Sequence, residues 1–195
     1  YIVDANNAPN VMREIGRLRE IAFRNAGGGT GKDCDIDEFD TMNPPCQQLI
    51  VWDPDAELII GGYRFITGKN IAIENGVPRI ATSHMFNFSD QFLNEYLPYT
   101  LELGRSFVRL EYQSSKAGAK ALYALDNLWD GLGALTVVYP EIKYLIFLYC
   151  VAFVIILMEL YYGFIKPDSF GIGNALYVII YLGVVSIIGF SYYSY

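Results

Sequence analysis

The sequence is poor in histidine, cysteine and basic residues, and each shortage excludes a class of protein. His84 is the one histidine among 195 residues, which excludes a metal centre built from several imidazoles, and we predict no metal. The three cysteines fit neither a zinc site nor a disulfide framework, which favours a reducing compartment. A net charge of −7 argues against non-specific nucleic-acid binding, because such binding needs a basic surface.

Charge is also scarce in the last quarter of the chain, where Glu159, Lys166 and Asp168 are the charged residues. Residues 1–143 have the composition of a soluble protein. We therefore divide the chain into a domain at 1–143 and a hydrophobic tail at 144–195. The chain begins at Tyr1 rather than at methionine, so we expect a fragment or a processed product with a truncated first strand.

The tail has two apolar runs, 144–165 and 169–195, each longer than the roughly 20 residues that span a bilayer core as a helix. The first interpretation is a two-helix membrane hairpin joined by a short polar turn. The second is that the runs are buried core elements. The third is that a shifted reading frame near Leu145 produces an apolar tail that is not genuine.

The rest of the chain predicts an α/β (α+β) fold, with a mainly antiparallel sheet flanked by helices. We expect an acidic, turn-rich loop at 33–45 and a second loop at 68–86 that contains an Asn75–Gly76 turn. The expected regular elements are a helix at 8–25, a strand hairpin at 46–53 and 57–67, a short helix at 88–97, a strand at 101–113 and a helix at 114–140.

Glu102, Gly104 and Arg105 are unexpected in the middle of the apolar strand 101–113. Regular alternation would put Glu102 and Arg105 on opposite faces. A β-bulge at Gly104 would bring them to one face and would free backbone N–H groups. These residues then make sense as a binding or catalytic site, although a structural ion pair is the alternative.

Five motifs in order resemble the GNAT acyltransferases, in the ornithine-lipid and glycine-lipid branch that is often labelled hemolysin-like. This branch is related to the acyl-homoserine-lactone synthases. The resemblance covers residues 10–143. The motifs are Arg19, Phe23 and Arg24 in the first helix, "DIDEFD" at 35–40, the strand pair 49–66, "LELGRSFVRLEYQ" at 101–113 and "ALDNLWDGLGAL" at 124–135.

The resemblance implies a GNAT fold and an enzyme that moves a 3-hydroxyacyl chain from acyl carrier protein to the amine of an amino acid, of the glycine or ornithine type. Glu102 would be the general base, and Arg105 would hold Glu102 or bind the substrate's carboxylate. Gly104, Ser106 and Phe107 would contact the oxyanion and the acyl chain. The amine pocket would be formed by Arg24, Asp37, Asp40, Arg64 and His84, although we favour a packed loop residue for His84.

The donor site departs from the family pattern. GNAT proteins usually carry an Arg/Gln-x-x-Gly-x-Gly/Ala loop at the start of the long helix, but here Ser115 and Lys120 replace two of its residues. We predict that Ser114, Ser115 and Lys116 bind the donor's phosphopantetheine, and that acyl carrier protein is favoured over coenzyme A as its carrier. No bound cofactor is implied.

A second departure follows the long helix, where the family has a further strand. Residues 142–153 begin in that way and then lose the pattern. The expected partners are acyl carrier protein, an amino acid and a lipid surface, at the cytoplasmic face of a bacterial inner membrane. A membrane protein with a non-catalytic GNAT-like head, or a lactone-synthase-like enzyme that uses S-adenosylmethionine, is the alternative.

Overall fold

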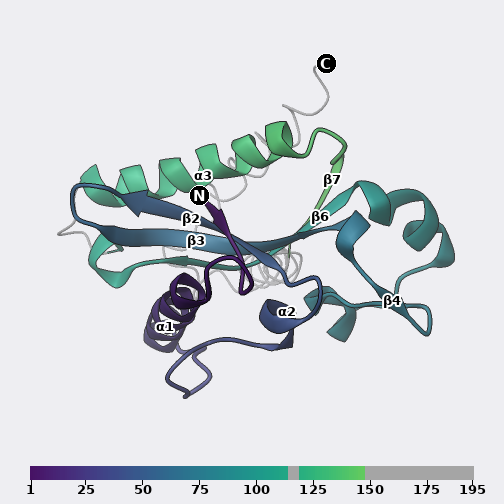
Figure 1. Ribbon diagram of the computed structural model, residues 1–195, viewed down its shortest axis with the longest axis horizontal. Helices are drawn as coiled ribbons and strands as arrows, with labels where there is room; N and C mark the ends of the chain where they lie inside the picture. The colour runs from purple at the N-terminus through teal and green to yellow at the C-terminus, as the bar shows by residue number, and fades with distance from the viewer. Residues whose placement is uncertain (114–118, 148–195) are drawn as a thin grey trace, which may run out of the picture. The chain divides into compact units, whose positions relative to one another are not determined.

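The computed structural model of the chain describes residues 1–113 and 119–147 (Figure 1). Ser114, Ser115 and Lys116, which are predicted to bind phosphopantetheine, lie outside these residues. The hydrophobic tail lies outside them from residue 148 onward. Residues Tyr1–Phe147 form one compact unit.

A mixed sheet is the centre of this unit, and its order within the described residues is β1-β2-β3-β6-β7. Neighbouring strands are antiparallel except for β6 and β7, which are parallel. The predicted hairpin is confirmed as β2 and β3. The strands are β1 Ile2–Val3, β2 Gln47–Asp53, β3 Leu58–Thr67, β6 Thr100–Val108 and β7 Tyr144–Phe147.

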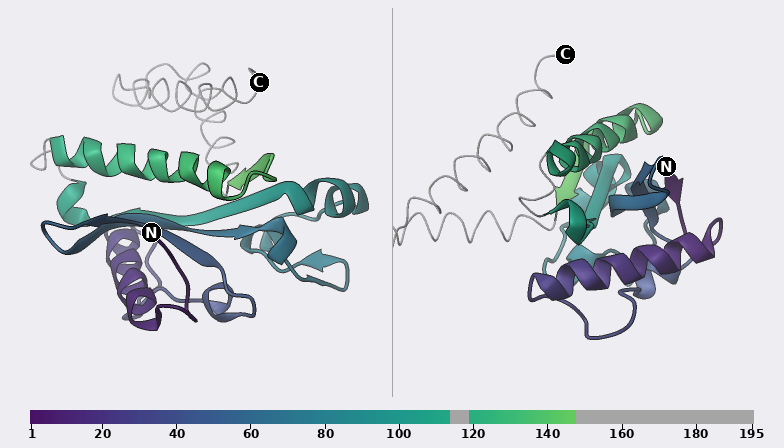
Figure 2. Two further views of the ribbon diagram at one scale, coloured as in Figure 1. Left: turned by 45° about the horizontal axis from the view of Figure 1, so that its top comes forward. Right: turned by 90° about the vertical axis from the view of Figure 1, so that its left-hand side faces the viewer.

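Helix α1 (Pro9–Asn25) covers one face of the sheet and helix α3 (Ala119–Val138) covers the other (Figure 2). Apolar residues at three- and four-residue spacing on α1 pack against Ile50, Ile59 and Phe107, as the helical period predicts. On the other face, α3 packs against Leu101 and Leu103. Alternation along β6 therefore turns Glu102, which lies between these two leucines, toward the side of α1.

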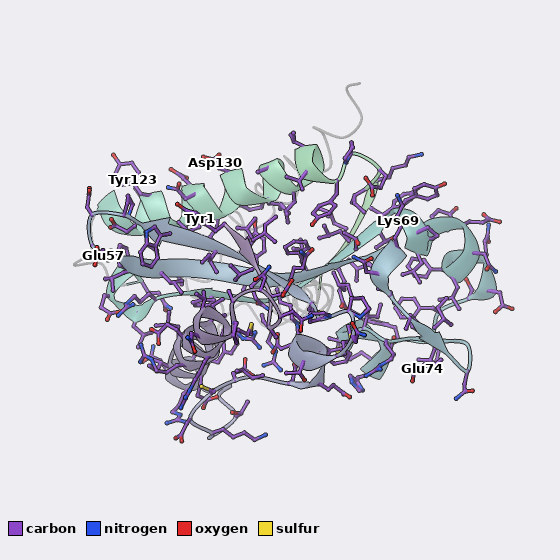
Figure 3. All side chains as sticks on the ribbon, in the orientation of Figure 1. Tyr1, Glu57, Lys69, Glu74, Tyr123 and Asp130 are labelled. Atoms are coloured by element: carbon purple, nitrogen blue, oxygen red, sulfur yellow. The ribbon has the colours of Figure 1, made fainter. Side chains whose placement is uncertain are left out.

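Helix α3 lies close to the sheet because it has a glycine at the contact. A Cβ atom at Gly131 would lie 2.7 Å from Leu49 Cδ2 and 3.1 Å from the Tyr63 hydroxyl. That hydroxyl donates a hydrogen bond of 2.9 Å to the carbonyl of Leu128. Tyr123 and Asp130, labelled in Figure 3, project from α3 on the side away from the sheet.

Residues 68–99, here called the lobe, connect β3 to β6 and lie beside one end of the sheet (Figure 1). The predicted Asn75–Gly76 turn is confirmed, because both residues have positive φ angles (54° and 79°), as a type I′ hairpin turn requires. The lobe packs against Phe39, Cys46 and Ile66. Its elements are η1 Gly68–Asn70, β4 Ile73–Glu74, β5 Val77–Pro78, η2 Ala81–His84, the π-helix η3 Phe92–Tyr96 and η4 Leu97–Tyr99.

Two sequence-based boundaries are corrected. The acidic loop contains a helical turn, α2 (Glu38–Thr41), which a capping box between Asp37 and Asp40 stabilises. The predicted strand 101–113 ends at Val108, and η5 (Leu110–Tyr112) follows it.

The boundary at residue 143 is also corrected. Tyr144–Phe147 form β7, which pairs with Thr100–Leu103 of β6, so these four residues belong to the sheet rather than to a membrane helix. This is the further strand that the family pattern predicts. No helix within residues 1–113 and 119–147 is long and apolar enough to cross a bilayer.

Candidate active site

A β-bulge in strand β6 is the first feature of the site. Gly62 pairs with Phe107, and Arg64 pairs with Gly104, so β6 has two residues where β3 has one. The extra residue is Arg105, whose φ angle of 52° lies in the left-handed region. The predicted bulge is therefore present, but Arg105 rather than Gly104 has the positive φ angle. The bulge resets the alternation, and Arg105 reaches Asp35 and Asp37, which lie directly before α2, as the ion pairs below show.

Glu102 is a buried carboxylate, 6% exposed, on the same strand. Its Oε1 atom accepts hydrogen bonds from the backbone N–H of Thr82 (2.9 Å) and from the Thr82 hydroxyl (2.8 Å). Arg105 is not its partner, because the Arg105 guanidinium binds Asp35 and Asp37. The prediction that Arg105 holds Glu102 in place is therefore wrong, and Thr82 of the lobe takes that role.

Arg105 belongs to a closed ring of six charged side chains in which arginine and aspartate alternate, so the ring has no net charge. The distances between neighbouring N and O atoms range from 2.6 Å to 3.4 Å. Gln48 donates a further hydrogen bond of 2.9 Å to Asp40. In order, the members of the ring are Arg19, Asp35, Arg105, Asp37, Arg64 and Asp40.

The ring is mostly buried but reaches solvent at two neighbouring members. The side chains of Arg105 and Asp37 are 31% and 25% exposed. Those of the other four members are at most 5% exposed. The ring therefore presents one guanidinium and one carboxylate, 3.0 Å apart, to the outside.

Local structure explains how the ring forms between distant segments. Gly16 lets the chain at Asp35 and Ile36 approach α1, since a Cβ atom there would lie 2.7 Å from Ile36 Cγ1. The Asp35 N–H donates to the Gly16 carbonyl at 2.9 Å. The capping box of α2 fixes Asp37 and Asp40 relative to each other. The three arginines come from α1 (Arg19), β3 (Arg64) and β6 (Arg105).

Open space adjoins the ring on the bulged strand. Among the residues that the structure describes, a Cβ atom built on Gly104 would meet nothing within 4 Å. Gly104 pairs with Arg64 across the strands, and one residue, Leu103, lies between it and Glu102. The pairing of β6 with β7 is described as far as Leu103 and Phe147, so an oxyanion contact at the Gly104 backbone stays a prediction.

The electrostatics of the ring are clearest at Asp37. Burial alone would raise its pKa, but the hydrogen bond and the charge of Arg64, together with the charges of Arg105 and Arg19, lower it from 3.8 to about 2. Asp37 is therefore ionised throughout the physiological range. At Arg64 the effect is reciprocal. Burial would lower the pKa of the guanidinium, but the carboxylates of Asp37 and Asp40 raise it.

The low pKa of Asp37 predicts acid sensitivity. Because the unfolded chain takes up the proton first, at about pH 3.8, the stabilisation is complete above that pH and is lost as the pH falls toward 2. The shift corresponds to about 2 kcal/mol. The free energy of unfolding is measured in urea at pH 7, 5 and 3. Its fall between pH 5 and pH 3 should be smaller in Asp37→Asn than in the native chain, whereas Asp55→Asn, in the exposed turn, should leave this fall unchanged. An equal fall in the free energy of unfolding for the native chain and Asp37→Asn would contradict this prediction.

Cys46 and His84 lie near the site without forming it. Burial raises the pKa of the Cys46 thiol to about 12, so it is protonated at neutral pH and is not a nucleophile. The exposed His84 ring packs edge-on against Phe39, with 5.8 Å between the ring centroids. Phe39 in turn lies under the Arg64 guanidinium at 5.3 Å. His84 is the last residue of η2, and its part in an amine pocket stays a prediction.

Three predicted site residues lie apart from the ring. Arg24 is 60% exposed and pairs with Glu20, so it does not form part of the site. Phe107 is buried in the core beneath α1, which leaves it no surface for an acyl chain. Ser106 is exposed on the bulge.

Glu20, on α1, instead binds the glycine-rich loop that follows this helix, residues 26–33. It accepts hydrogen bonds from the Thr30 hydroxyl, from the Thr30 and Gly31 backbones and from Arg24. The Thr30 hydroxyl contributes most to lowering the Glu20 pKa to about 2. An open cleft of about 560 Å³ adjoins this loop, on the side of α1 that carries Arg17 and Arg24, and contains none of the ring residues.

Sequence reasoning missed Arg19, Asp35, Gln48 and Thr82 as site residues. Arg19 had a detectable signal, because it falls four residues after Ile15 and three before Ala22, on the apolar stripe of α1. A charge on the buried stripe of a helix indicates a buried partner. Thr82 had no such signal, because its role depends on how the lobe folds back toward β6.

Comparison with known proteins places this geometry in a family. The acetyltransferase (GNAT) domain model matches residues 18–123. A glycine N(alpha)-acyltransferase of Bacteroides thetaiotaomicron is 69% identical over 145 residues, which cover 74% of this chain and 43% of that protein. The protein of the same name from Phocaeicola vulgatus is 66% identical over 145 residues, which cover 74% of this chain and 44% of that protein.

The chain therefore spans less than half the length of these two relatives. No solved structure matches it. The family model covers more than half of the chain, and the bulged strand, the charge ring and Glu102 lie within the matched residues. The chain belongs to the acetyltransferase (GNAT) domain family.

Proposed function

We propose that the chain transfers an acyl group from the thioester of an acyl carrier protein to the α-amine of glycine. The observation that carries the proposal is the pair of ring members that reach solvent. One guanidinium and one carboxylate, 3.0 Å apart, complement the carboxylate and the ammonium of a zwitterionic amino acid. The name of the two relatives supports glycine as that amino acid.

In the proposed acceptor site, Arg105 binds the carboxylate of glycine. Its three hydrogen bonds to Asp35 and Asp37 come from Nη1 and Nη2, and a guanidinium has five N–H groups, so donors remain for a ligand. Asp37 receives the ammonium group. The open space beside Gly104 then holds the amine near Glu102.

The proposed reaction needs one proton acceptor and one oxyanion site. Glu102, directly or through a water, takes a proton from the ammonium, and the amine nitrogen attacks the thioester carbon. Backbone N–H groups at the bulge stabilise the tetrahedral oxyanion. The C–S bond then breaks, the nitrogen loses its second proton as the amide forms, and the leaving pantetheine thiolate takes up that proton.

The donor side of the proposal rests on the family resemblance. Ser114, Ser115 and Lys116 would bind the phosphopantetheine, and a 3-hydroxyacyl chain would give a lyso-aminolipid of the glycine-lipid type. Such a product requires work at a membrane surface, which we propose to be the cytoplasmic face of the inner membrane.

Acyl transfer measured by mass spectrometry tests the proposal. The full chain is incubated with 3-hydroxyacyl carrier protein and glycine, ornithine or serine. We expect N-acylglycine as the main product, since the site is complementary to a small zwitterion. A folded chain that makes no N-acyl product with any of the three would contradict the proposal. A lactone formed only on addition of S-adenosylmethionine would favour a signal-making enzyme instead.

A further inference from the structure

We infer that Thr82 is a positioning residue for the reaction: it fixes one oxygen of Glu102 so that the other faces the acceptor amine. The inference rests on the proposed function, in which Glu102 accepts the amine proton. It concerns a residue of the lobe, which neither the family motifs nor the bulged strand includes.

The geometry around Glu102 is asymmetric. Both Thr82 donors bind the same atom, Oε1, at 2.9 Å and 2.8 Å. Within the described part of the chain, every fully buried polar side-chain atom has a hydrogen-bond partner. No described residue donates a hydrogen bond to Oε2, so Oε2 is the oxygen that retains access to solvent. Two donors on one oxygen hold the carboxylate plane and leave the second oxygen free for a proton.

Thr82 is itself held in place by the lobe, independently of Glu102. Its carbonyl accepts hydrogen bonds from the N–H groups of Met85 and Phe86, both at 3.0 Å. Ile80, two residues earlier in the chain, is 1% exposed in the core of the lobe. The Thr82 N–H lies in the first turn of η2, where backbone donors have no partner within the helix. This donor is therefore available to the carboxylate.

The same contacts link the lobe to catalysis. Thr82 is 1% exposed and Glu102 is 6% exposed, so water competes little for these hydrogen bonds. A carboxylate that is free to rotate would spend less time with an oxygen directed at the amine. Small misplacements of catalytic groups can cost up to about 10²-fold in rate. The lobe therefore acts as the support that orients the base.

Thr82→Val tests the inference, because valine keeps the shape and the backbone donor but removes the hydroxyl. We expect kcat for N-acylglycine formation to fall about 10-fold, as for loss of one hydrogen bond to a charged group, with KM for glycine unchanged. Thr82→Ser, which keeps the hydroxyl, should restore most of the activity. The matched control is Thr100→Val, since the buried Thr100 hydroxyl donates to the Tyr96 carbonyl at 2.8 Å and not to Glu102.

A double variant separates positioning from a merely structural role. If Thr82 acts only through Glu102, then Glu102→Gln/Thr82→Val should have the same kcat as Glu102→Gln. Thermal unfolding of each variant checks that the fold is kept. The inference is overturned if Thr82→Val retains native kcat, or if it lowers kcat by the same factor in both backgrounds. The proposed function fails separately, if the native chain makes no product at all.

Discussion

Replacing Glu102 by glutamine should lower kcat for N-acylglycine formation by about 10²-fold or more, the range for loss of a general base. The amide has the shape of the carboxylate, and its oxygen can still accept the two Thr82 hydrogen bonds, so the fold should be kept. What disappears is the proton acceptor on an oxygen that reaches solvent. The assay is the mass-spectrometric measurement of N-acylglycine, with native chain and variant at equal concentrations.

Two comparisons make this result specific to a base. Glu111→Gln changes an exposed carboxylate, 66% exposed and paired with Arg109, and should leave the rate unchanged. The difference in kcat between Glu102→Gln and the native chain should become smaller as the pH rises, because solvent then removes the ammonium proton without a protein base. A variant within a few-fold of the native rate at neutral pH would show that Glu102 is a structural carboxylate, the alternative that its spacing on the strand left open.

The sequence predicted the regular elements best where a segment carries its own periodic signal. The first helix was expected at 8–25 and occupies Pro9–Asn25, because its apolar period is sufficient to define it. The single turn α2 was missed because four residues have no period, and its capping box and the ring hold it in place. Tyr144–Phe147 were assigned to the hydrophobic tail rather than to the further strand of the family pattern, because a short apolar run has the same hydropathy in a buried strand as in a membrane helix.

The candidate site was predicted in part for a related reason. Motif resemblance brought Asp37, Asp40, Arg64 and Arg105 together, and the structure joins all four in one ring. It also included Arg24, which follows Arg19 by five residues and so lies on another face of α1. The contact from Thr82 to Glu102 depends on the three-dimensional path of the lobe and cannot be read from spacing.

The ring predicts a large effect on stability at Arg19. Its side chain is fully buried and makes three hydrogen bonds, one to Asp35 and two to Asp40. Arg19→Met keeps an unbranched apolar stem but leaves two carboxylates, 2% and 0% exposed, without this partner. Breaking a buried ion pair in this way costs about 3–5 kcal/mol. We therefore expect Arg19→Met to unfold at a much lower urea concentration than the native chain. Urea unfolding monitored by far-ultraviolet circular dichroism measures this difference.

Arg17→Met is the matched control, because Arg17 lies on the same helix and also pairs with a carboxylate. Its pair with Glu14 is 44% and 41% exposed, and such surface pairs contribute about 0–1 kcal/mol. Adding Asp40→Asn to Arg19→Met should recover part of the loss, since it removes one of the two buried carboxylates that lose Arg19 as a partner. Equal losses for Arg19→Met and Arg17→Met would mean that the ring does not stabilise the fold. Its buried members would then have to be explained by their effect on Asp37 and Arg105, the two members that reach solvent.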